Sequence, residues 1–93
     1  MNPVLQRAEL LYAQRRYDLA AEQLRQVLAA DPDDARAHAW LGLCLAHAEK
    51  YEEAVRETTQ AVHLGPDLSF AHYAVASVLE DRGEYARALG AIE

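Results

Sequence analysis

The chain has 93 residues, a net charge of −6 and a hydrophobic fraction of 52%. Its acidic balance argues against binding to nucleic acids or anionic membranes, because both attract clustered Lys and Arg side chains. No apolar stretch reaches the roughly 20 residues that cross a bilayer, and the N-terminal segment lacks the pattern of a secretion signal. We therefore expect a soluble, cytoplasmic protein.

Two antiparallel helices are predicted in the first third of the chain. A helix over residues 2–14 is indicated by Asn2, a good N-cap, and by Pro3, whose missing N–H is not needed at the first helical position. A second helix is predicted over residues 17–30, where apolar side chains recur at helical spacing. The connection at residues 15–16 is so short that the two helices must lie antiparallel.

Proline residues separate this pair of helices from the next one. Pro32 and Pro66 cannot continue a helix, and each disfavours helical geometry in the residue before it. Between them the sequence predicts a second pair of helices, with a short turn at residues 49–50. Beyond Pro66 we expect another first helix, a turn at residues 83–84 and a last helix over residues 85–93.

A period of 34 residues organises the chain, as the spacing of Tyr17, Tyr51 and Tyr85 shows. The same interval relates Leu11, Leu45 and Leu79, then Ala20, Ala54 and Ala88, and finally Pro32 and Pro66. The units of this single array are residues 1–34, 35–68 and 69–93, the third of them incomplete. A fixed period of this size indicates an architecture in which each unit buries its apolar face against its neighbours.

The pattern resembles the tetratricopeptide repeat, a family of helix-turn-helix units with the same period. Leu41-Gly42, Ala54 and Pro66 match the leucine-glycine, alanine and proline positions of that family, whereas His38 stands where it usually has tryptophan. The resemblance covers the whole chain. It implies an all-α fold, a right-handed solenoid of antiparallel helix-turn-helix repeats, and a non-catalytic role as a protein–protein interaction module.

Catalytic, cofactor and metal sites are not indicated. The sequence has no glycine-rich phosphate loop, no nucleophile elbow and no plausible catalytic triad. His38 and His72 hold the same place in successive units, so they should lie too far apart to share a metal ion. Cys44, the single cysteine, is expected to be a small core residue. We therefore predict that the chain is not an enzyme and binds no cofactor or metal.

The resemblance also implies a concave groove, lined by the first helix of each unit, that accepts a peptide or helix of a partner protein. The positions that would face such a ligand are Leu5, Glu9, Tyr12, Arg36, Trp40, Leu43, His47, Phe70, Tyr73 and Ser77. Positions 36, 40, 43 and 47 do follow one stripe of a helix. Aromatic residues are typical anchors of protein interfaces, but these can equally pack on neighbouring first helices. The sequence leaves both interpretations open.

Self-association, or an architectural role in a longer repeat protein, is the alternative function. The expected last helix ends before its unit is complete, so no further helix covers its apolar edge. That edge comprises Leu79, Tyr85, Leu89 and Ile92. We expect either that the natural chain continues past Glu93, where a catalytic domain could follow, or that copies associate through this edge into a homo-oligomer.

Overall fold

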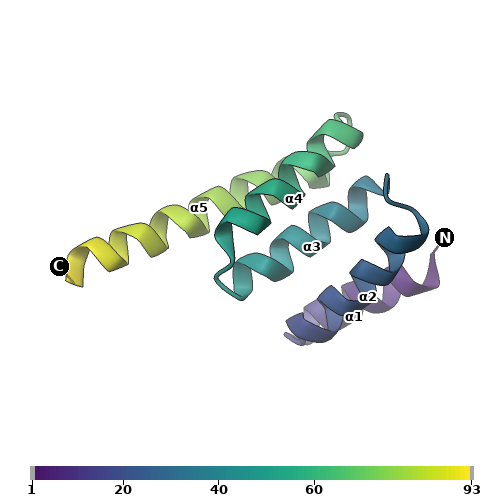
Figure 1. Ribbon diagram of the computed structural model, residues 1–93, viewed down its shortest axis with the longest axis horizontal. Helices are drawn as coiled ribbons and strands as arrows, with labels where there is room; N and C mark the ends of the chain where they lie inside the picture. The colour runs from purple at the N-terminus through teal and green to yellow at the C-terminus, as the bar shows by residue number, and fades with distance from the viewer. Residues whose placement is uncertain (1, 93) are drawn as a thin grey trace.

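The computed structural model describes residues 2–92, and side chains as far as residue 90. Within residues 2–92 the structure contains helices, joined by short turns, and no strand. The helices are α1 (Pro3–Ala13), α2 (Tyr17–Ala30), α3 (Ala35–His47), α4 (Tyr51–Leu64) and α5 (Ser69–Ile92). The prediction of an all-α fold built from helix-turn-helix pairs is confirmed, and Figure 1 shows α1 beside α2 and α3 beside α4. The right-handed superhelix stays a prediction.

Polar side chains fix the starts of α1 and α3. Asn2 Oδ1 accepts hydrogen bonds from the N–H groups of Val4 at 2.9 Å and Leu5 at 3.3 Å, so the predicted N-cap is confirmed. Asp34 caps α3 in the same way, because its carboxylate accepts from the Ala37 N–H at 3.0 Å. Such caps satisfy N–H groups that have no partner inside the helix.

The turns within the two helix pairs share one backbone geometry. Arg15 and Glu49 both lie in the left-handed region, with φ of 63° and 62°. In each turn the next residue donates its N–H to a carbonyl of the preceding helix, Leu11 at 2.8 Å and Leu45 at 2.9 Å. This bond is typical of a helix that ends in a left-handed residue. The repeat therefore extends from the side chains to the conformation of the turn.

The third unit does not follow this plan. The predicted turn at residues 83–84 and the separate last helix from Tyr85 are wrong, because α5 runs without a break from Ser69 to Ile92. A helix of 24 residues is about 36 Å long. Its C-terminal turns project beyond the other helices, as Figure 1 shows.

The physical reason lies in the difference between glycine and proline. Gly83 stands one repeat after Glu49, yet it is helical and has no positive φ. Glycine makes a left-handed turn free of steric cost, but it does not exclude the helix. Pro32 and Pro66 do exclude it, and both helix pairs end before them. The sequence permits a turn at Gly83 without imposing one.

Helix α3 lies at the centre of the molecule. It packs against α2, α4 and α5 and also touches α1 (Figure 1). All residues from 41 to 46 are buried. Helices α3 and α4 approach each other closely at Gly42, where a Cβ would overlap the Thr58 methyl group and lie 3.0 Å from the Ala54 carbonyl oxygen. The leucine-glycine pair of the second unit thus serves the contact between α3 and α4.

Histidine side chains tie the connections between units to the helices that follow them. His38 Nε2 lies 2.7 Å from the Pro32 carbonyl oxygen, and His72 Nε2 lies 2.8 Å from that of Pro66. A carbonyl group only accepts hydrogen bonds, so Nε2 carries the proton in both rings. His38 also contacts Glu57 Oε1 through Nδ1 at 3.0 Å. These two imidazoles therefore fix the positions of the loops.

Candidate functional site

A continuous row of aromatic side chains crosses the first helices α1, α3 and α5. Trp40 of α3 lies between Tyr12 of α1 and Phe70 of α5, with ring centroids 4.9 and 4.6 Å away. Tyr73 extends the row along α5, 6.1 Å from Phe70, and Tyr17 of α2 closes the other end, 5.2 Å from Tyr12. These distances are typical of favourable aromatic pairs. We call the five residues the aromatic row.

The aromatic row is packed at its centre and open at its end. Trp40 and Phe70 are half-buried against the core, and the Trp40 N–H is buried without an acceptor among the described residues. Tyr73, by contrast, is 62% exposed. Leu43, which the sequence placed in the groove, is only 4% exposed and belongs to the core. The inner rings therefore join neighbouring first helices, whereas Tyr73 is accessible.

The remaining predicted groove residues surround the aromatic row. The Arg36 guanidinium lies 5.7 Å from the centroid of the Phe70 ring, within the range of a cation–π contact. Leu5, Glu9 and Ser77 are half-buried on α1 and α5. We use the name first-helix surface for the accessible parts of Leu5, Glu9, Tyr12, Arg36, Trp40, His47, Phe70, Tyr73 and Ser77.

His47 connects the aromatic row to the C-terminal end of α3. Its ring stacks on Tyr17, with centroids 3.9 Å apart and planes 4° apart, and its Nε2 lies 3.0 Å from the Tyr12 hydroxyl. Burial, more than nearby charges, raises the pKa of Tyr12 to about 12. The hydroxyl is therefore protonated at neutral pH, and it donates to His47 Nε2 when that nitrogen carries no proton.

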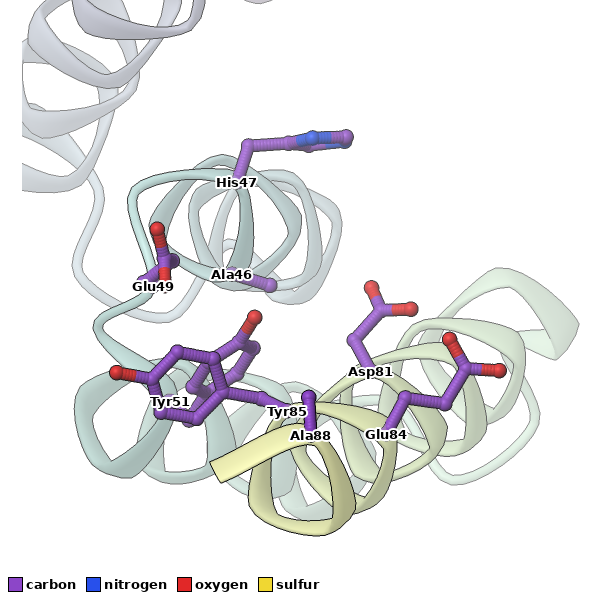
Figure 2. A pocket seen from close by; sticks show the side chains of 8 residues that line it. All are labelled: Ala46, His47, Glu49, Tyr51, Asp81, Glu84, Tyr85 and Ala88. Atoms are coloured by element: carbon purple, nitrogen blue, oxygen red, sulfur yellow. The ribbon is translucent and has the colours of Figure 1, made fainter. Parts of the chain in front are cut away.

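A hollow of about 490 Å³ lies beside His47, where the end of α3 meets the C-terminal half of α5 (Figure 2). Its lining consists of Ala46, His47, Glu49, Tyr51, Asp81, Glu84, Tyr85 and Ala88. The Tyr51 and Tyr85 rings contact each other with centroids 5.1 Å apart. Figure 2 shows Asp81 and Glu84 projecting from α5 on one side of these two rings. We call this feature the acidic hollow.

Negative charge dominates the acidic hollow. Glu49, Asp81 and Glu84 line it together with no Lys or Arg. Within residues 2–90 no ion pair engages these three carboxylates. Burial, followed by the charges of Glu49 and Asp81, raises the pKa of Tyr51. Carboxylates beside aromatic ring faces form an environment that attracts a cationic side chain.

The predicted self-association edge is accessible where the structure describes it. Leu79, Tyr85 and Leu89 are 42%, 38% and 47% exposed, and the side chain of Ile92 lies outside the described residues. Tyr85 belongs to the acidic hollow instead of starting a separate helix. Association of copies through this edge stays a prediction.

Sequence reasoning did not find the acidic hollow. The only signal was the repeated tyrosine, since Tyr17 and Tyr51 each contact an aromatic residue one helix further along the array, His47 and Tyr85 respectively. The second contact exists because α5 continues as a helix past Gly83. Because the sequence also allows a turn at Gly83, it does not reveal the contact between Tyr51 and Tyr85.

The described residues offer no arrangement typical of a metal site, a reactive thiol or a membrane span. No group of three or more His, Cys, Asp or Glu side chains there is arranged to hold a metal ion. Cys44 is buried, and burial raises the pKa of its thiol to about 12. None of the helices within residues 2–92 has the length and apolar character needed to cross a membrane.

Comparison with known proteins agrees with the repeat pattern. The family model described as tetratricopeptide repeat matches residues 5–69 of the chain. This segment includes nearly all of both helix pairs and stops at the start of α5, so the part of α5 that departs from the helix-turn-helix plan lies outside it. No curated protein and no solved structure matched the chain.

Proposed function

The chain belongs to the tetratricopeptide repeat family of protein–protein interaction modules, and from this premise we propose that its first-helix surface binds a segment of a partner protein. Tyr73 carries the proposal. Among residues 2–90 it is the most exposed of the large apolar side chains, yet its ring continues a row that is packed into the core through Phe70 and Trp40. An accessible ring held by a rigid support binds with little loss of conformational entropy.

The acidic hollow indicates the chemistry of the partner segment. Its three carboxylates favour a Lys or Arg side chain, and the net charge of −6 favours the approach of a basic partner. Tyr73 and Asp81 are eight positions apart on α5, about 12 Å along the helix axis. An extended segment covers about 3.3 Å per residue, so its apolar and basic residues should be about four positions apart.

Selection from a display library of short random peptides tests the binding surface. We expect the wild-type chain to enrich peptides, and Tyr73→Ala to weaken their binding by about tenfold or more, as for a hot-spot residue. Leu19→Ala is the matched control, because Leu19 is 48% exposed on α2 and belongs neither to the first-helix surface nor to the acidic hollow. No enrichment, or equal losses for both variants, would contradict the proposal.

The same selection tests the preference for a basic segment separately. Asp81→Asn combined with Glu84→Gln keeps the shape of the acidic hollow and removes two of its charges. We expect the wild type to enrich Lys or Arg about four positions from an apolar residue, and this double variant to lose only the basic preference. Enriched peptides that depend on Tyr73 but contain no basic residue would support binding at the first-helix surface. They would contradict the preference for a basic segment.

A further inference from the structure

Helix α5 leaves uncovered an apolar face that is covered in the two preceding units. Ala8 and Gly42 are buried where α2 and α4 pack on α1 and α3, but Ala76, one repeat later, is exposed. Leu45 is 5% exposed, whereas its counterpart Leu79 is 42% exposed. The face of α5 that should receive a second helix is therefore open.

A hollow of about 380 Å³ marks this open face. It is lined from α4 by Thr59, Val62 and His63, and from α5 by His72, Val75, Ala76 and Leu79. The four α5 residues occupy the positions of His38, Leu41, Gly42 and Leu45, the face of α3 on which α4 lies. The hollow thus lies where the second helix of the third unit would pack.

The C-terminal half of α5 carries the side chains suited to this place. Tyr85, Ala88 and Leu89 stand one repeat after Tyr51, Ala54 and Val55 of α4. Ala54 is fully buried at the contact with α3, whereas residues 84–90 of the straight α5 are all exposed. The matching segment is present but lies away from the face that it matches.

Gly83 stands where the backbone would have to turn. In both preceding units this position is left-handed, although it is held by Arg15 and Glu49, for which that conformation is unfavourable. Glycine adopts it without steric cost, and glycine is also the weakest helix former after proline. The third unit therefore has the residue best suited to a left-handed turn, but in the straight α5 this residue is helical and no turn forms.

We propose that Gly83 is a hinge, and that residues 85–92 exchange between the straight end of α5 and a folded-back helix on the face of His72, Val75, Ala76 and Leu79. The two positions exclude each other. In the straight form Glu84, Tyr85 and Ala88 line the acidic hollow, and in the folded-back form they leave it. Whatever binds in the acidic hollow therefore favours the straight form.

A disulfide between positions 76 and 88 detects the folded-back form. Cys44→Ala removes the natural thiol, and Ala76→Cys with Ala88→Cys supplies the pair. Along a straight helix these positions are about 18 Å apart, too far for a bond that needs Cα atoms within about 7 Å. In the second unit the equivalent residues touch, since a Cβ on Gly42 would lie 3.0 Å from the Ala54 carbonyl oxygen. We expect a bond within one chain in a glutathione redox buffer.

Two glycine variants separate the hinge from ordinary helix stabilisation. Gly83→Ala favours the helix and disfavours the left-handed turn, and a Cβ there meets only the end of Arg87 at 3.6 Å. Gly90→Ala favours the helix equally and meets nothing within 4 Å. We expect Gly83→Ala to lower the equilibrium yield of the disulfide by about tenfold or more, and Gly90→Ala by less than about twofold.

Amide hydrogen exchange of the 93-residue chain without added cysteines gives an independent reading. Folding back removes the helical hydrogen bonds of the Tyr85, Ala86 and Arg87 N–H groups, so Gly83→Ala should slow their exchange and Gly90→Ala should not. The proposal is overturned if the disulfide joins two chains instead of one. It is also overturned if no bond forms while these amides are unaffected by Gly83→Ala, or if both glycine variants act alike.

Discussion

Replacing Gly42 with alanine probes the contact on which the packing of α3 against α4 depends. The added Cβ would overlap the Thr58 methyl group and approach the Ala54 carbonyl oxygen and the Thr58 backbone nitrogen, at 3.0 and 3.3 Å. A side-chain methyl group can rotate away, but the two backbone atoms cannot. The helices must therefore separate slightly, although alanine is by itself the better helix former.

The expected change follows from these opposing effects. Overpacking a tight core costs about 1–3 kcal/mol, and alanine regains about 1 kcal/mol over glycine within a helix. Because backbone atoms form part of the contact, we expect the upper part of this range and a net loss of about 1–2 kcal/mol. For a chain of this size such a loss lowers Tm by about 5–15 °C.

Thermal and urea unfolding followed by far-ultraviolet circular dichroism measure this loss. Gly90→Ala is the control, because its Cβ meets nothing within 4 Å and should leave stability unchanged or slightly raised. Thr58→Ser removes the overlapping methyl group, so the double variant Gly42→Ala/Thr58→Ser should lose less than the sum of the single losses. If Gly42→Ala is as stable as the wild type, the close approach of α3 and α4 does not limit this contact.

Three other predictions concern the core, the thiol and a helix cap. Trp40→Ala should lower the free energy of unfolding, measured in urea, by about 3 kcal/mol, and Tyr73→Ala should lower it by less than about 1 kcal/mol. Equal losses would refute the division of the aromatic row into packed and accessible parts. Burial raises the pKa of the Cys44 thiol from 9.0 to about 12, so the thiol should resist thiol reagents until the chain unfolds. Because the thiol of the unfolded chain ionises first, the free energy of unfolding should fall as pH rises from about 9 to 12. The free energy of unfolding of a Cys44→Ala variant should fall less over that range. Asp34→Ala should cost about 1 kcal/mol by removing the cap of α3, whereas a similar loss in Asp33→Ala would show that general charge, and not the cap, is responsible.

The first four helices were predictable because their determinants are local. The cap at Asn2, the prolines at 32 and 66 and the apolar spacing set their bounds within a residue or two. Helix α5 was not predictable in the same way, since Gly83 is compatible with both a turn and a helix. The choice between them depends on how well residues 85–92 pack in each position, and no local pattern contains that balance.

The candidate site was predictable only in part. Helical periodicity placed Trp40, Leu43 and His47 on one stripe of a helix, but it did not reveal that Leu43 is buried while His47 is exposed. That difference depends on the neighbouring helices, which cover α3 over residues 41–46 and leave its last residue, His47, exposed. The ring contacts of Trp40 arise in the same way, because its neighbours Tyr12 and Phe70 come from other units.

The central position of α3 makes the folding of this array cooperative. Residues 41–46 contribute to the cores of both helix pairs, so neither pair keeps a complete core when α3 separates. Long repeat arrays can lose their units one after another, each unit contacting only its neighbours. Here α2 on one side, and α4 and α5 on the other, all pack on α3. The loss of the helices on one side of α3 therefore destabilises those on the other side. We expect a partner bound at the first-helix surface also to protect α2 and α4, which contribute no residue to that surface.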